Sequence, residues 1–244
     1  MPESDREQKQ ARREAVWAQL DREGISTVPR PVRGRIPNVK DAAVAARRLA
    51  ETPEWERARV VKVNPDPPQR PVRFRALRDG KVLLMPPPGL RAGFLMLRIE
   101  PQRLAPHQLY AASSIKGAFA VGEAIGLENL PAIDLLVFGS VAVSTSGERV
   151  GKGEGYAELE FAVLRTLGVV SDDIPIATTV HDAQVVPAIP REPFDVTLDL
   201  ICTPTRTLRP AHRGPRPPGV LWDALPSERL ADMPVLGELR ARLR

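Results

Sequence analysis

VGKGEGYAELE, residues 150–160, is the stretch around which the rest of the chain is organised. Its three glycines alternate with Lys152 and Glu154, and an amphipathic segment begins at Tyr156. Alternating glycines let backbone N–H groups gather round an anion, and a helix that follows adds the partial positive charge of its first turn. The pattern predicts a phosphate-binding loop. A plain strand-to-helix turn with positive φ at two or three places fits the same spacing, so the short pattern alone leaves both interpretations open.

Neither of the two best-known phosphate motifs accounts for this loop. A dinucleotide-binding fingerprint that begins at Gly151 requires glycine at its sixth position, which is Tyr156 here. A P-loop requires GxxxxGK followed by serine or threonine, whereas the segment from Gly147 to Gly153 is one residue short and lacks the hydroxyl group. A phosphate-binding role for this loop therefore falls outside both classes.

Apolar runs on both sides of the loop predict a parallel β-sheet. Residues 133–139 precede the loop, residues 175–180 follow a predicted helix at 156–167, and residues 198–203 form a further run. Apolar strands that alternate with helices are typical of a parallel sheet covered on both faces. Ligands of such sheets bind at the carboxyl ends of the strands. We therefore expect the glycine loop and His181, which each follow a strand, at that edge.

The other expected elements are short, because 26 prolines interrupt the chain. Ser4 and Asn38 are suitable helix caps. Helices are predicted at residues 4–22, 38–49 and 108–125, and strands at 59–64, 81–85 and 93–99, while residues 72–78 fit either state.

The composition changes after Arg209 to a segment rich in proline and arginine. It indicates an exposed tether, which leads to a terminal helix at residues 227–244 that Pro234 interrupts. We therefore predict a single α/β domain at residues 1–209, followed by the tether and the terminal helix at 210–244.

Charge and composition restrict the class of partner. The net charge of +5 and the pI near 9.8 suit anionic partners such as nucleotides, polyglutamates or nucleic acid. The arginines are spread along the chain with little aromatic interleaving, which argues against a specific nucleic-acid surface. Cys202 is the single cysteine and reads as a buried, inert thiol. Residues 135–143, the longest apolar run, are too short to span a bilayer, so we expect a soluble cytoplasmic protein with no membrane partner.

Taken together, several segments resemble the 5-formyltetrahydrofolate cyclo-ligases, also called methenyltetrahydrofolate synthetases. The match is closest to a divergent branch of methenyltetrahydrofolate synthetase domain-containing proteins. Vertebrate members of that branch carry an RNA-recognition module at the carboxyl end, and this module has no counterpart here. The segments that carry the resemblance are Pro29-Arg-Pro-Val32, Arg35-Ile-Pro-Asn38, 61–66, 139–143, 151–160, 180–186 and 202–206.

The resemblance implies a fold and a reaction. The fold is a three-layer α/β sandwich with a mostly parallel sheet, of the NagB/RpiA/CoA-transferase-like type. The reaction is the ATP- and Mg²⁺-dependent cyclisation of 5-formyltetrahydrofolate, or of a related formylated amine, to the 5,10-methenyl product. In it the formyl oxygen attacks the γ-phosphate, and a neighbouring nitrogen then closes the ring. Such chemistry requires phosphate positioning and charge neutralisation more than a protein nucleophile.

The resemblance also assigns roles to individual residues. Lys9 and Arg13 match a KxxxR pair that reaches the ATP phosphates. The phosphates would also be held by the loop, with Lys152 adding charge, and Tyr156 matches the first tyrosine of the family's GxGGGYYDR sequence. Glu158 falls where that sequence has an aspartate, near Mg²⁺. The nucleotide-binding set is thus Lys9, Arg13, Gly151, Gly153, Glu154 and Gly155, the catalytic set is Lys152, Tyr156 and His181, and the metal ligand is Glu158.

Departures from the family pattern leave alternatives open. Glu154 replaces a glycine, Ala157 replaces the second tyrosine, and Leu159 stands where the family has an arginine that neutralises phosphate charge. An arginine from residues 30–35 is one candidate replacement. The alternative function is a catalytically weak, regulatory protein that binds nucleotide or folate, with RNA binding as a further alternative. His181 beside Asp182 fits a group that orients or protonates substrate, and equally a hydrogen-bonded loop residue.

Overall fold

A computed structural model describes residues 4–90, 93–211 and 213–243. Within these ranges the chain builds one large mixed sheet whose strand order is β11-β10-β8-β5-β1-β2-β3-β4. The five strands from β10 to β2 run parallel, and β11, β3 and β4 add antiparallel edges. Their bounds are β1 Val60–Val63, β2 Val82–Met85, β3 Met96–Ile99, β4 Glu123–Ile125, β5 Leu135–Phe138, β8 Ile176–Thr179, β10 Leu200–Cys202 and β11 Thr207–Leu208.

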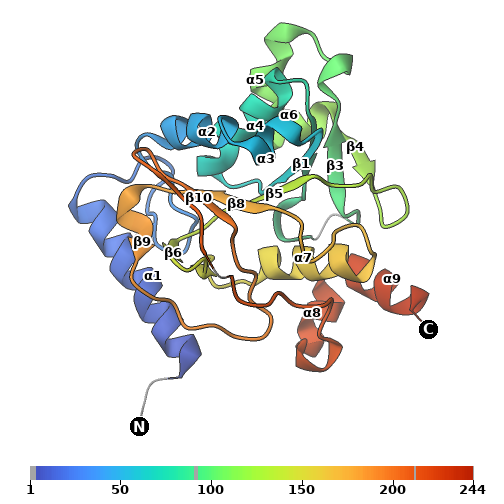
Figure 1. Cartoon of the computed structure of the whole chain (residues 1–244). Helices are drawn as coiled ribbons and strands as arrows, with labels where there is room; N and C mark the ends of the chain where they lie inside the picture. The colour runs from blue at the N-terminus through green and yellow to red at the C-terminus, as the bar shows by residue number, and fades with distance from the viewer. Residues whose placement is uncertain (1–3, 91–92, 212, 244) are drawn as a thin grey trace.

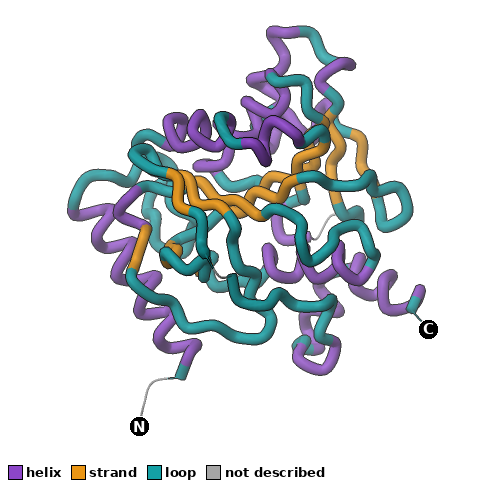
Figure 2. Tube along the Cα trace, viewed as in Figure 1, coloured by secondary structure: helices purple, strands orange, loops and turns teal. Residues whose placement is uncertain are grey.

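Helices cover both faces of this sheet (Figures 1 and 2). One face packs against α2 (Ala42–Ala50), α3 (Pro53–Arg57), α4 (Arg70–Arg78), α5 (Leu109–Ala112) and α6 (Ile115–Val121). The other packs against α7 (Tyr156–Thr166) and α9 (Pro234–Arg242). Alternate residues of β5 serve the two layers, because successive side chains of a strand point to opposite faces. The predicted three-layer α/β arrangement with a mostly parallel sheet is confirmed.

A second, smaller sheet lies beside the first and was missed in the sequence. It has the order β7-β6-β9 and consists of β6 (Ala142–Ser144), β7 (Arg149–Val150) and β9 (Val185–Val186). Strands this short carry too few residues for an alternating pattern to stand out. Helix α1 (Asp5–Arg22) packs over it through Val16, Trp17 and Leu20. The glycine loop therefore follows β7, so the small sheet connects it to the end of β5.

The expected start of α1 is confirmed, whereas that of α2 is wrong. Ser4 accepts from the Glu7 N–H and Glu7 accepts from the Ser4 N–H, a reciprocal capping box. Asn38 does not cap a helix, because its Nδ2 donates to the Val28 carbonyl (2.7 Å). Helix α2 begins four residues later, after Asp41 adopts a left-handed φ of 58°.

The single helix predicted at residues 108–125 is divided. Helix α5 ends at Ala112, with Ser113 as its C-cap, and Ser114 caps α6 by accepting from the Gly117 N–H (3.0 Å). Gly122 then turns the chain into an extended conformation, and the last three residues form β4 beside β3. Residues 72–78, which fitted helix or strand in the sequence, belong to α4.

The carboxyl-terminal segment is anchored to the main body, so the expectation of an exposed tether is wrong. Arg216 is buried and donates to the carbonyls of Thr197 and Ile174. Two helices follow, α8 (Ser227–Asp232) and α9, and they meet at Pro234 as expected. Leu236 and Leu239 of α9 join the main core, where each buried side chain contributes about 1.5–3 kcal/mol. The division at residue 209 stays a prediction, and Arg244 lies outside the described residues.

Across the described ranges, each helix is either too short or too polar to cross a lipid bilayer.

Candidate functional site

The glycine loop, residues 151–155, joins β7 to α7. Gly153 has a φ of +104° and Gly155, the residue before α7, a φ of +71°, and residues with a Cβ rarely adopt these conformations. The first N–H groups of α7 have no partner within the helix, and the helix dipole adds partial positive charge at the same end. The loop and the helix end together offer N–H donors to an anion.

Two cavities open on either side of this loop. Cavity A, about 430 Å³, lies between the loop, α1, residues 192–195 and residues 217–229. Cavity B, about 340 Å³, lies where β1, β2 and β5 end at their carboxyl sides. The loop thus forms the partition between the two cavities, and the lining residues they share are Arg149, Gly151, Glu154, Gly155 and Glu158.

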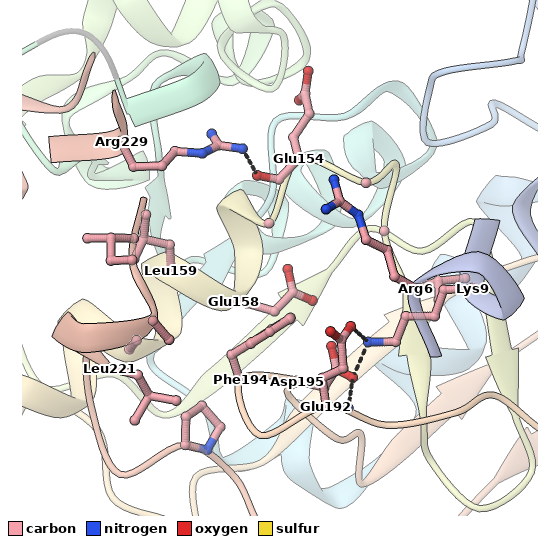
Figure 3. Close-up of a pocket in the computed structure, with 18 of the residues that line it drawn as sticks. Arg6, Lys9, Glu154, Glu158, Leu159, Glu192, Phe194, Asp195, Leu221 and Arg229 are labelled. Carbon is pink, nitrogen blue, oxygen red and sulfur yellow. Dashed lines mark hydrogen bonds and ion pairs between the residues drawn. The ribbon is translucent and has the colours of Figure 1, made fainter. Parts of the chain in front are cut away.

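Cations from α1 lie at one end of cavity A (Figure 3). The Lys9 ammonium is buried between the carboxylates of Glu192 (2.6 Å) and Asp195 (2.5 Å). Arg13 donates from Nε to the Gly151 carbonyl (2.7 Å), so α1 contacts the loop directly. Burial lowers the pKa of Arg13 and raises the pKa of Asp195. Of the predicted KxxxR pair, Arg13 therefore contacts the loop, whereas Lys9 is held by two carboxylates of residues 192–195.

Arg149 is the central cation of the site, and sequence reasoning missed it. It is only 3% exposed and forms an ion pair with Glu158, while Nη2 donates to the Gly139 carbonyl (2.8 Å). Its buried Nε has no hydrogen-bond partner among the described residues. Arg149 therefore places a guanidinium charge, paired with Glu158, at the boundary of the two cavities. The available signal was its position, two residues before Gly151 at the end of a short strand.

Arg149 is also a candidate to replace the arginine that the family has at position 159. Leu159 is half-buried and packs against the main core. Of the arginines proposed as replacements, Arg30 donates to the Ser26 carbonyl and Arg33 pairs with Glu14, and only Arg35 lines cavity B. The guanidinium between the cavities is therefore that of Arg149.

Cavity B contains an acidic residue, Asp66, at the end of β1. Asp66 lines it, and among the described residues no group donates a hydrogen bond to this carboxylate. Burial raises the pKa of Asp66, although Lys152, Arg73 and Lys62 oppose the effect. Sequence reasoning missed Asp66 too. The signal was an acidic residue between prolines, just after an apolar strand.

The remaining loop residues lie at the cavity rims. Lys152 forms an ion pair with Glu154 (2.6 Å), and its ammonium is 5.9 Å from the centre of the Tyr156 ring. Both Lys152 and Tyr156 line cavity B, while Gly153 lines cavity A. The residues expected to form one site thus divide between the two cavities.

His181 is not brought to the loop. It precedes a 3₁₀ turn at Asp182–Gln184, where its Nδ1 accepts from the Ala183 N–H (3.1 Å). Gln184 in turn donates to the carbonyls of Ser140 and Val141. In the described part of the chain, neither cavity has His181 in its lining. Its surroundings are those of a hydrogen-bonded loop residue.

The expected metal ligand, Glu158, is engaged by Arg149. Within residues 4–90, 93–211 and 213–243, no group of three or more His, Cys, Asp or Glu side chains forms a metal cage. Mg²⁺ that accompanies a nucleotide is held mainly by phosphates and water, with one or two protein carboxylates. Glu158 fits that lesser role if its pair with Arg149 opens.

Comparisons with known proteins place this sequence and its fold beside one protein family. A model of the 5-formyltetrahydrofolate cyclo-ligase family matches residues 5–204. Methenyltetrahydrofolate synthase domain-containing proteins of Mus musculus and Homo sapiens are 42% and 39% identical over 236 and 237 residues. Each alignment covers 96% of this chain, and the chain spans 63% and 62% of those relatives. The NMR structure of 5,10-methenyltetrahydrofolate synthetase from Aquifex aeolicus shares the fold, with a TM-score of 0.53 and 18% identity over 84% of this chain and 94% of that one.

Proposed function

The chain belongs to the 5-formyltetrahydrofolate cyclo-ligase family, and from that premise we propose that it is an ATP-dependent cyclo-ligase. Its substrate would be 5-formyltetrahydrofolate or a related formylated amine, and its product the cyclic methenyl compound. Mg²⁺ would enter with ATP as part of the substrate.

One observation carries the proposal: two cavities adjoin across a phosphate-type loop and share Arg149 and Glu158. A reaction that transfers a phosphoryl group from one ligand to another needs two binding spaces that meet at a charge-neutralising centre. Cavity A, with Lys9 and Arg13, suits the nucleotide. Cavity B, with Asp66 at the strand ends, suits the formylated amine.

In the proposed chemistry the formyl oxygen bonds to the γ-phosphorus as the bond to the β,γ-bridging oxygen breaks and ADP leaves. The neighbouring amine nitrogen then bonds to the formyl carbon, and phosphate and a proton leave. Negative charge would develop beside the Arg149 guanidinium, which lines both cavities. A preorganised charged group of this kind contributes about 10²–10³-fold in rate. We assign Arg149 the charge-neutralising role, and we assign His181 none.

Two glycines with the same backbone conformation test the proposal. Gly155 in the loop and Gly168 after α7 both have a φ of +71°, and a Cβ added at either position would meet no heavy atom within 4 Å. Alanine at either position strains the backbone by about 1–2 kcal/mol. With 5-formyltetrahydrofolate and Mg-ATP, we expect the wild type and Gly168→Ala to form the methenyl chromophore and release phosphate. Gly155→Ala should slow both at least tenfold.

Equal loss of turnover in the two glycine variants would contradict the role of the loop. No chromophore and no phosphate from the wild type would contradict the cyclo-ligase itself.

A second function, nucleotide binding without turnover, is favoured by Leu159, which packs against the main core at the position where the family has a charge-neutralising arginine. This function predicts that Mg-ATP raises the unfolding temperature of the wild type, since a ligand that binds only the folded state stabilises it. Gly155→Ala would lose that stabilisation. The absence of phosphate release would then separate this function from the first.

A further inference from the structure

A segment outside the family match forms one wall of cavity A. The family match ends at residue 204, whereas residues 217–229 line the cavity opposite the glycine loop. The segment contributes the apolar side chains of Val220, Leu221 and Leu225. The apolar side chains of Leu159, Ala162 and Phe194 line the same cavity.

This wall is fixed at both ends. On the amino-terminal side, the buried Arg216 donates to the Asp172 carbonyl (2.8 Å) and pairs with Asp199 (2.5 Å). The Val220 N–H donates to the Thr166 hydroxyl at the end of α7 (2.9 Å). On the other side α9 is buried in the main core. The wall is therefore a built part of the cavity.

Cavity A consequently has two ends of opposite character. The end at α1 and the glycine loop is polar, with Lys9, Arg13 and Arg149 and the carboxylates of Glu158, Glu192 and Asp195, whereas the end at residues 217–229 is apolar except for Arg229. Phe194 lies between them: its ring is 5.4 Å from the Lys9 ammonium and its side chain is 42% exposed, although it lines the cavity. A ligand that matches this arrangement is anionic at one end and flat and apolar at the other, as a nucleoside triphosphate is.

Arg229 connects the wall to the loop (Figure 3). Its Nη2 donates to the Glu154 carbonyl (2.6 Å), and its guanidinium lies 5.1 Å from the centre of the Tyr156 ring. A displacement of the wall therefore displaces the loop, because a charged donor and a cation–π contact hold the two together.

We propose that residues 217–229 form the nucleobase wall of the nucleotide cavity and that Arg229 is a positioning residue that makes the glycine loop depend on this wall. The inference rests on the proposed function for the assignment of the triphosphate to cavity A. Base stacking on an aromatic ring, such as that of Phe194, is worth about tenfold in affinity.

The test measures binding rather than turnover, with Mg-ATP and inorganic tripolyphosphate as paired probes in titration calorimetry. The wild type should bind ATP at least tenfold more tightly than tripolyphosphate. Leu221→Asp and the milder Phe194→Ala should lower the affinity for ATP about tenfold. The affinity of both variants for tripolyphosphate should stay within about twofold of the wild-type value. The Phe194 variant removes a half-exposed ring, so it keeps the test decisive if Leu221→Asp does not fold.

Arg229→Ala should weaken both probes by about fivefold or more, since it acts through the loop, and Arg229→Lys should recover part of the loss. The matched control is Arg242→Ala, an arginine of α9 that pairs with Glu238 and Glu128 at the surface away from the cavity. It should change neither affinity. A purely structural role for Arg229 would lower the unfolding temperature without this pattern in the two affinities.

Several outcomes would overturn the inference. They are equal binding of ATP and tripolyphosphate by the wild type, unchanged ATP affinity in both wall variants, or weakened binding of 5-formyltetrahydrofolate instead of ATP. If the wild type turns ATP over and the wall variants bind ATP with wild-type affinity, the nucleobase wall is refuted but the proposed function is not. If the wild type does not bind ATP, both the wall and the proposed function are refuted.

Discussion

Two carboxylates of α7, Glu158 and Glu160, each pair with a cation from a strand, but the two pairs differ in access. Glu160 touches cavity B only, and its partner Lys62 of β1 is fully buried and lines neither cavity. Lys62 also donates to Asn64 (2.7 Å). Glu158 pairs with Arg149 of β7, and this pair lines both cavities. Residues two apart on a helix point in different directions, so one faces the sheet and the other faces the loop.

The two ion pairs differ in whether a hydrogen-bond donor of the cation is left without a partner. Burial lowers the pKa of Lys62 and raises that of Glu160, so this pair depends on mutual contact to stay charged. The Arg149 guanidinium lines both cavities, and its buried Nε has no hydrogen-bond partner among the described residues. The same ion-pair chemistry therefore supports the fold in one case and leaves capacity for a ligand in the other.

The largest expected effect is on stability, at the closed pair. Glu160→Ala leaves the Lys62 charge buried without a counter-ion, which should lower the free energy of unfolding by about 3–5 kcal/mol. Denaturant unfolding measures it. Glu158→Ala, the matched control beside the cavities, should cost less, because the Glu158 side chain is 13% exposed against 4% for Glu160 and Arg149 keeps its hydrogen bond to the Gly139 carbonyl. Replacing both partners, as Lys62→Met with Glu160→Leu, should restore most of the loss. Equal losses of unfolding free energy in Glu158→Ala and Glu160→Ala would contradict the proposed difference between the two ion pairs.

The next effect is on activity, at the open pair. Arg149→Met should lower the rate of methenyl formation by at least about 100-fold, because it removes the donor placed between the cavities. Its unfolding free energy should fall less than that of Glu160→Ala. Arg35→Met is the control, since Arg35 also lines cavity B. A larger rate loss at Arg35 than at Arg149 would transfer the charge-neutralising role to the segment at residues 30–35.

A smaller effect concerns the pH dependence of stability at Asp66. Because burial raises the folded-state pKa of Asp66 above its ordinary value of 3.8, the stability it contributes is complete below that value and is lost as pH rises through the folded pKa. Asp66→Asn should therefore raise the unfolding temperature at pH 7, with a difference that disappears toward pH 3. Asp173→Asn, at a position 97% exposed, should show no such trend. A lower unfolding temperature for Asp66→Asn at pH 7 would contradict this sign.

The smallest effect, on chemical reactivity, is expected at Cys202. This buried side chain lines neither cavity A nor cavity B and has no ion-pair partner among the described residues. Burial raises the pKa of this thiol to about 12. An alkylating reagent at pH 7 should leave the native protein unmodified and fully active, while the urea-unfolded chain reacts quickly. Rapid labelling of the native protein would place Cys202 among the accessible groups instead.

Much of the fold could be predicted from the sequence, because many of its elements depend on local sequence patterns. The apolar run at β5, the capping box at Ser4 and the helix after Gly155 are each specified by a few neighbouring residues. The errors arose where distant contacts decide the outcome. Asn38 has a cap's side chain but is engaged by the Val28 carbonyl, and the segment around Arg216 has the composition of a tether but is held by buried carbonyls.

The site divides in the same way. The sequence by itself determined the glycine loop, which is one contiguous motif, and its separate short segments determined the resemblance to the family, which in turn indicated the two cations of α1. Only the tertiary structure decided that Arg149 stands between two cavities, that Lys9 lies against two carboxylates about 180 residues later in the chain, and that His181 stays away. The physical reason is that burial and the availability of a donor depend on packing between segments far apart in the chain. For the loop of residues 150–160, packing thus decides which charges surround it.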